Sequence, residues 1–324
     1  MRRTTTPQDL EADRGWVAGS IERAATRGSL PWRLACVLLS ALVLLAAGVP
    51  SARAAEVYTP HLAVSDPVNR MPRERLAERA ARMEALLMKI AALWEADPAV
   101  DRLGKIRGVI LPQARELRLS VFHMVRDGST MVREVLAAPP DGPPQMLVHK
   151  LTSALFPSKD KLVRNMMGEV SEERLGNLRA FPRCGLAADA WVLALLRLGK
   201  YAPLRGLGPN HDTWGMADGD KGVPMTQDPD LHHRSYVEAA SFGVFLFERY
   251  GMARLKEFCR QAGDLGRPWE AVYGQGLDTL EAQWLEALRG KEAQLEPDVA
   301  LAAELYARDP AAACDQCQQA RPEK

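Results

Sequence analysis

The proline-rich segment at residues 139–144, with the sequence PPDGPP, separates two parts of the chain that have different hydrophobic patterns. Proline fixes its own φ angle and lacks a backbone N–H, so neither a helix nor a central strand continues through this segment. Before the break, short extended runs accompany one amphipathic helix, whereas the later apolar residues recur almost entirely at helical spacing. The sequence therefore predicts an α+β fold: a small mixed sheet with helices, then a mainly helical subdomain, with a cleft between the two.

The part before the break is expected to hold several strands and one long helix. Leu76, Met83 and Ile90 recur on one face of a helix within residues 73–96. Extended runs, expected to be strands, lie at residues 56–66, 105–112, 118–125 and 130–140.

The part after the break is expected to be almost all helix. The first two helices are placed at residues 145–156 and 184–199, and residues 205–230, rich in Gly, Pro, Asp and Asn, are expected to be a long loop. Each later helix ends at or near a glycine, a common helix stop. These helices are expected at residues 233–251, 252–263, 268–274 and 278–290.

The longest apolar run, residues 34–49, lies near the amino terminus. It is short for a membrane-spanning helix, which needs about 20 residues. Ala52 and Ala54 supply the small-x-small pattern that signal peptidase cleaves. Residues 1–54 are therefore expected to be a signal peptide cleaved after Ala54, or else an uncleaved anchor held in the membrane by residues 34–49. Both interpretations predict an exported protein, periplasmic or extracellular.

The remaining chain is expected to comprise an α/β half at residues 55–144, a helical half at 145–290, and a C-terminal helix and polar tail at 291–324. The 42 basic and 41 acidic residues nearly balance, which does not favour nucleic-acid binding. Four cysteines follow the signal segment, and an oxidising compartment would permit two disulfides among them. They are Cys184, Cys259, Cys314 and Cys317.

One short motif suggests chemistry: His149 opens the sequence His-Lys-Leu-Thr-Ser. In an HExxH helix, two histidines one turn apart hold zinc, and the glutamate takes a proton from the zinc-bound water. His149 and Ser153 share one helical face, as that spacing requires. Lys150, however, stands in place of the general base and is cationic at neutral pH. Ser153 stands in place of the second ligand and is a poor zinc donor.

In its order of motifs the chain resembles the peptidase-MA-like family of gluzincins, which are HExxH-type zinc metallopeptidases. The helix containing His149 resembles the family's LxHELTHAL, and residues 235–288 resemble a later segment that begins with YxxAxSFVxYLxxRYG and ends with LExxWxxxL. With weaker upstream matches, the resemblance covers residues 57–290. The matching positions in the later segment are Tyr236, Ala239, Ser241, Phe242, Leu246, Tyr250, Gly251, Leu255, Ala271, Gly274, Leu280 and Trp284.

The resemblance also shows where this chain departs from an active enzyme. When Gly185 is aligned with the glycine of the family pattern WLxEGLAxY, Cys184 takes the place of the third ligand, a glutamate. Only His149 of the zinc site then remains. The resemblance thus implies a pseudoenzyme that holds no zinc and keeps a cleft for a peptide or a cell-envelope protein. The alternative is an active zinc metallohydrolase with His149 and Cys184 as altered ligands. As a structural residue, Cys184 would be buried or bonded to Cys259.

Two other groups of residues are candidates for a role at the site. Tyr236 would stabilise an oxyanion in an active relative, according to the resemblance, and is otherwise a packing residue. His232 and His233, with His211 nearby, are the other histidine group, but adjacent histidines point apart in an extended chain and chelate poorly.

Lys150 itself poses an electrostatic requirement. A buried ammonium group is costly without a partner. Lys150 is therefore expected either to reach solvent or to pair with Asp189 or Glu238, and in the second case the fixed cation would suit an anionic ligand.

Overall fold

A computed structural model describes residues 55–69, 71–98, 103–110, 120–137, 146–176, 178–218, 224–263 and 266–310. The expected signal segment, the proline-rich break at 139–144 and the two cysteines of the polar tail lie outside these residues. Among the described residues, none of the helices has the length and apolar character to cross a membrane.

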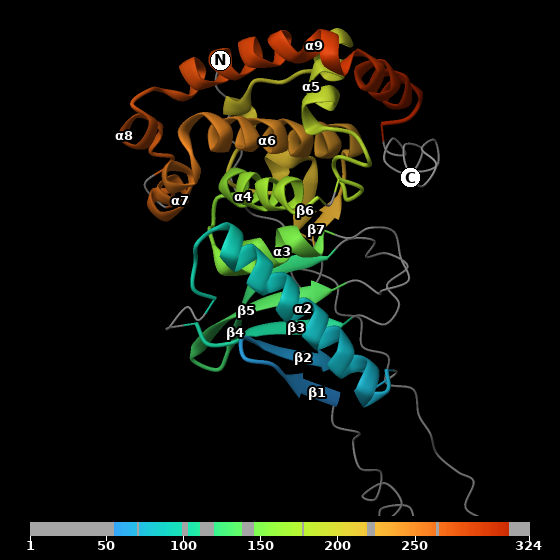
Figure 1. The fold of residues 1–324 in the computed structure, drawn as a ribbon, viewed down its shortest axis with the longest axis vertical. Coiled ribbons are helices and arrows are strands. Elements are labelled where there is room, and N and C mark those ends of the chain that lie inside the picture. The colour runs from blue at the N-terminus through green and yellow to red at the C-terminus, as the bar shows by residue number, and fades with distance from the viewer. Residues whose placement is uncertain are drawn as a thin grey trace, which may run out of the picture. The chain divides into compact units, whose positions relative to one another are not determined.

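A five-stranded mixed sheet begins the described chain (Figure 1). Its strand order is β1-β2-β3-β5-β4, with β2, β3 and β5 parallel and both edge strands antiparallel to their neighbours. The elements are β1 (Ala55–Tyr58), β2 (Leu62–Asp66), α2 (Arg73–Leu93), β3 (Ile106–Ile110), β4 (Val121–Asp127) and β5 (Thr130–Ala137). Helix α2 connects the parallel strands β2 and β3, as a β-α-β crossover requires.

One face of this sheet is covered by two helices. Strands β2 and β3 alternate buried and half-buried residues, which is the period of a sheet with one covered face. Helix α2 packs on β1 and β2, and α3 (Leu147–Leu155) packs on β4 and β5 and against α2.

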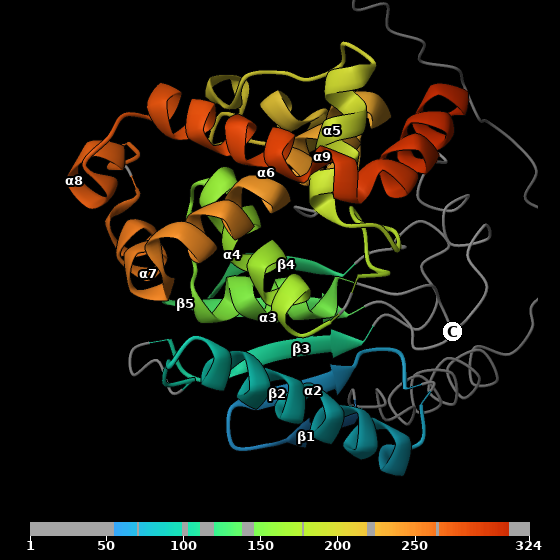
Figure 2. The same ribbon diagram turned by 45° about the horizontal axis from the view of Figure 1, so that its top comes forward.

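The helical part continues away from α3 in further layers (Figures 1 and 2). Helix α4 (Lys161–Arg174) packs on α3, α6 (Pro229–Tyr250) packs on α4, and α5 (Ala188–Arg197) packs on both α6 and α9 (Leu277–Arg308). The smaller elements are η1 (Leu204–Gly206), η2 (Asp212–Trp214), β6 (Met216–Asp218), β7 (Pro224–Thr226), α7 (Met252–Gln261) and α8 (Trp269–Tyr273).

Helices α4 and α6 approach each other closely because a glycine lies at their contact. A Cβ atom at Gly243 would come 3.0 Å from the backbone Cα of Met166. Helix α4 is thereby held between α3 and α6, with side chains of all three helices buried along it.

The expected α+β class is confirmed: a small sheet with helices precedes a mainly helical part. Several elements differ from the sequence prediction. The run expected as one strand at residues 56–66 is a hairpin, because Thr59 turns the chain and its N–H bonds to the carbonyl of Leu62. Helix α4 had not been expected. The expected loop at 205–230 holds a two-stranded hairpin, and the helices expected on either side of residue 290 are one continuous helix, α9.

The packing between α3 and the later helices involves large side chains in one buried cluster. Leu151, Leu155, Leu246 and Trp284 belong to it, as the helical periodicity predicts. Phe242 is fully buried, and its ring lies 5.4 Å from that of Trp284 and 5.9 Å from that of Trp269.

Replacing Phe242 with alanine should lower the free energy of unfolding by about 3–5 kcal/mol, because the cavity left behind cannot refill. Met88→Ala, at a 43% exposed position on α2, is the control and should change it by less than about 0.5 kcal/mol. Chemical denaturation measures both. A loss below about 1 kcal/mol for Phe242→Ala would contradict the packing described here.

Candidate functional site

The helix that carries His149 is buried along most of its length. Val148, Leu151 and Leu155 are apolar residues packed in the core, and the His149 side chain is only 1% exposed. The Ser153 hydroxyl donates a hydrogen bond to the carbonyl oxygen of His149, at 3.0 Å. The serine in the second-ligand position therefore bonds to its own helix, one turn back.

Helix α4 supplies Glu169, the residue whose side chain contacts the His149 ring. The Asp160 side chain caps this helix by accepting hydrogen bonds from two backbone N–H groups of its first turn. One helical face then presents Glu169 and Glu172 to α3. His149 Nδ1 lies 2.8 Å from Glu169 Oε1, and the His149 backbone N–H donates to Glu172 Oε1 at 2.9 Å.

This close contact of helices depends on a glycine. A Cβ atom at Gly168 would lie 2.5–2.6 Å from three atoms of the His149 ring, closer than van der Waals contact permits. The imidazole therefore lies directly against the backbone of α4, in the space that a side chain at 168 would take.

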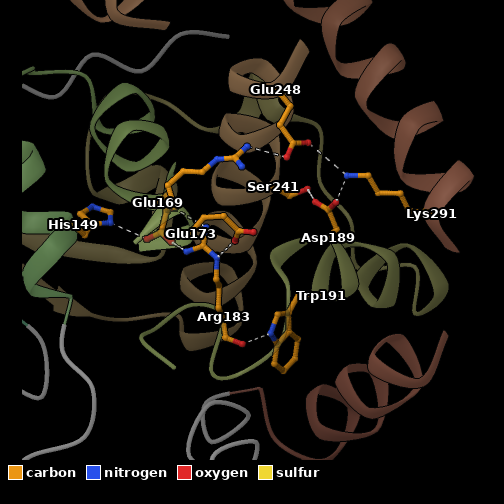
Figure 3. Close-up of polar contacts among 10 residues, drawn as sticks. His149, Glu169, Glu173, Arg183, Asp189, Trp191, Ser241, Glu248 and Lys291 are labelled. Carbon is orange, nitrogen blue, oxygen red and sulfur yellow. Dashed lines mark hydrogen bonds and ion pairs between the residues drawn. The ribbon is translucent and has the colours of Figure 1, made fainter. Parts of the chain in front are cut away.

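A buried arginine completes the group, as Figure 3 shows. Arg183 Nη1 lies 2.5 Å from Glu169 Oε2, and Arg183 Nη2 donates to the Glu169 carbonyl oxygen at 2.7 Å. Arg183 Nε donates to Glu173 Oε2 at 2.9 Å, and the Trp191 indole N–H donates to the Arg183 carbonyl at 2.7 Å. We call His149, Glu169, Glu173 and Arg183 the buried ionic network.

Burial and charge set the protonation states in this network. Burial raises the pKa of Glu169, and the positive charges of Arg183 and Lys150 oppose that rise. Burial lowers the pKa of His149 well below its ordinary value, and the charges of Lys150 and Lys161 lower it further. His149 is therefore neutral near pH 7. With Arg183 held on the other carboxylate oxygen, Glu169 Oε1 accepts a hydrogen bond from Nδ1–H of His149.

The structure places Cys184 in a turn before α5, which begins at Ala188, and not inside a helix. Its backbone φ is +54°, in the left-handed region. Cys184 is disulfide-bonded, whereas Cys259 is a free, buried thiol. The suggested pairing of these two cysteines is therefore wrong, and the Cys184 partner lies outside the described residues. A sulfur in a disulfide does not supply the thiolate that zinc would need.

Lys150 does not pair with either carboxylate named from the sequence. Asp189 instead binds Lys291 Nζ at 2.8 Å and accepts a hydrogen bond from the Ser241 hydroxyl (Figure 3). Glu238 accepts a hydrogen bond from the backbone N–H of Ala202, at 3.2 Å. Both predicted partners were wrong, because each carboxylate is bonded to a donor from another helix or loop.

Tyr236 lies close to His149, with 6.4 Å between the ring centroids, and its hydroxyl accepts a hydrogen bond from Lys161 Nζ at 3.1 Å. The other histidines are held separately. His233 Nε2 lies 3.2 Å from the Pro182 carbonyl, and His232 Nδ1 lies 3.3 Å from the Thr226 hydroxyl. Within the part of the chain that the structure describes, no three His, Cys, Asp or Glu side chains are grouped to hold a metal ion.

The sequence analysis identified His149, Lys150 and Tyr236, and the structure brings all three to the contact of α3, α4 and α6. It missed Glu169, Arg183 and the whole of α4. The available signal was an aspartate followed by buried residues at helical spacing, such as Val163, Met166 and Val170.

Comparisons with known proteins do not extend the resemblance noted in the sequence. No protein-family model matches the chain, and neither curated proteins nor solved structures yielded a match. The likeness to the peptidase-MA-like family remains a prediction that rests on the residues themselves.

Replacing Arg183 with methionine should lower the free energy of unfolding by about 3–5 kcal/mol, because the buried Glu169 carboxylate would lose its charged partner and would have to take up a proton. The double variant Glu169→Gln with Arg183→Met removes both charges and should lose less free energy of unfolding than Arg183→Met alone. Arg308→Met breaks an exposed ion pair with Glu304 on α9 and is the control, at less than about 1 kcal/mol. A loss below about 1 kcal/mol for Arg183→Met would show that the buried ionic network does not stabilise the fold.

Proposed function

We propose that this protein is a non-catalytic, exported domain that binds a peptide or a cell-envelope protein, and that its peptidase-like helix now has a structural role. The observation that carries the proposal is the buried ionic network. His149 Nδ1 is bonded to Glu169, and Glu169 is held by Arg183. The one candidate ligand that the zinc-peptidase pattern keeps is therefore built into the packing of α3 against α4.

The side chains at the site do not fit a catalytic zinc ion. Lys150 places a positive charge at the position of the general base. Arg183 places a second positive charge 2.5 Å from Glu169, the carboxylate that binds His149. The Ser153 hydroxyl bonds to its own helix, and the sulfur of Cys184 is in a disulfide. Cations repel a divalent metal, and these donors are not available as ligands.

The disulfide supports the proposal that the protein is exported. Disulfides persist in oxidising compartments such as the periplasm and the extracellular space, and they are rare in reducing ones. Cys184 forms its disulfide at the turn that also carries Arg183. The disulfide-bonded cysteine and the arginine of the ion pair are therefore neighbours in one turn.

The purified mature protein should contain no stoichiometric zinc and should show no peptidase activity that a chelator abolishes. Elemental analysis and a peptidase assay with mixed peptide substrates measure these two properties. About one zinc per chain, lost in a His149→Gln variant whose circular dichroism matches that of the wild type, would contradict the proposal. It would then favour the alternative of an active metallohydrolase with altered ligands.

A further inference from the structure

A group of cationic and polar side chains lies beside the buried ionic network, at the same contact of α3, α4 and α6. Lys161, Arg164 and Asn165 have the three-to-four spacing that places side chains on one face of α4. Lys161 Nζ reaches the hydroxyl of Tyr236 on α6, at 3.1 Å. Lys150 extends from α3, next to His149 in the sequence.

The positive charges of Lys150 and Arg164 have no direct ion pair among the described residues. Arg164 Nη1 donates to the carbonyl oxygen of Ser158, at 2.9 Å. The nearest acid on its own helix, Asp160, already binds Arg267 through both carboxylate oxygens, at 2.8 and 3.2 Å. Burial lowers the pKa of Lys150 to about 8, and repulsion from the positive charge of Arg164 contributes to the shift.

The group also contains an unsatisfied donor. Asn165 is 2% exposed, and its Nδ2 atom, although near the Tyr236 hydroxyl, has no partner at hydrogen-bonding geometry among the described residues. A buried amide donor without a partner costs free energy, and a bound acceptor would remove that cost. Lys150 and Arg164 are only half-buried, so part of each side chain is exposed to solvent.

Aromatic rings form one wall of this group. Lys161 Nζ lies 5.1 Å from the ring centroid of Trp214 and 5.0 Å from that of Tyr236. Two buried carboxylates of α4, Glu169 and Glu172, attract Lys150. Their negative charge would disfavour a dianion such as phosphate, whereas a monoanion needs less positive charge to be held.

We propose that Lys150, Arg164 and Asn165, with Tyr236 beside them, form a binding site for a single carboxylate group, such as the C-terminal carboxylate of a peptide. Arginine and lysine bind carboxylates through charge-assisted hydrogen bonds, and the amide of Asn165 would donate a further bond. This inference rests on the proposed binding function and names the chemistry that the partner presents.

The test measures binding of short peptides to the full mature protein by chemical-shift titration. Acetyl-Gly-Gly with a free carboxylate is compared with its C-terminal amide, and with acetyl-Glu amide, which presents a side-chain carboxylate instead. The free-carboxylate peptide should bind saturably, at least tenfold more tightly than the amide of the same peptide. Equal or tighter binding of acetyl-Glu amide would assign the site to an acidic side chain, and the carboxylate proposal would stand.

Variants then locate the site. Lys150→Met should weaken carboxylate binding at least tenfold, whereas Lys150→Arg should keep it within about threefold. Lys89→Met, an exposed lysine on α2, is the charge-matched control and should leave binding unchanged. Circular dichroism checks that each variant is folded, and Arg164→Gln provides a second disruption. Absent binding in the wild type, equal binding of acetyl-Gly-Gly and its amide, or no effect of Lys150→Met would overturn the inference. None of these results depends on the zinc and peptidase measurements, so the two proposals can fail separately.

Discussion

The negative charge of Glu169 is the constraint on which the centre of this molecule depends. The residue is fully buried, and an ionised carboxylate is stable there only with partners. Arg183 supplies the opposite charge from the turn before α5, and His149 supplies a hydrogen bond from α3. Helix α3 and the turn before α5 are thereby both held by one side chain of α4. The same turn carries Cys184, which is disulfide-bonded.

This arrangement gives a physical account of the departures from a zinc-peptidase pattern. At positions where that chemistry would need free ligands and a base, the chain has residues that bond to the protein itself. Ser153 bonds to its own helix, and His149 bonds to Glu169. Lys150 is the exception, because it forms no ion pair among the described residues and gives the site a charge that favours anions. Helix α3 thus keeps the residue spacing of an HExxH helix, while its side-chain contacts suit packing and anion binding.

The fold class and most helices could be predicted because they follow from local periodicity, as in α2 and α6. The ion pairs of the buried ionic network could not be predicted, since tertiary packing joins residues that are 14 and 20 positions apart in the sequence. Helix α4 was missed because its inward face carries Glu169, Glu172 and Asn165, and buried polar residues hide a helix from a search for apolar repeats. With α4 missing, the candidate partners offered for Lys150 did not include Glu169 and Glu172, the carboxylates that attract it. Gly168 leaves room for the His149 ring because it has no side chain. That contact could not be predicted, because nothing in the sequence indicates which residue lies opposite a glycine.

The central claim, that His149 is a neutral structural residue held by Glu169, can be tested most directly by nitrogen-15 NMR of its imidazole. The folded-state pKa is lowered, so its contribution to stability is present above the unfolded value of about 6.5 and is lost as pH falls below it. The account predicts a neutral ring from pH 8 down to pH 5, with the proton on Nδ1 at pH 8, where Glu169 is ionised, and no change on addition of one equivalent of zinc. A ring that titrates near pH 6.5, or whose nitrogen shifts move on addition of zinc, would contradict it.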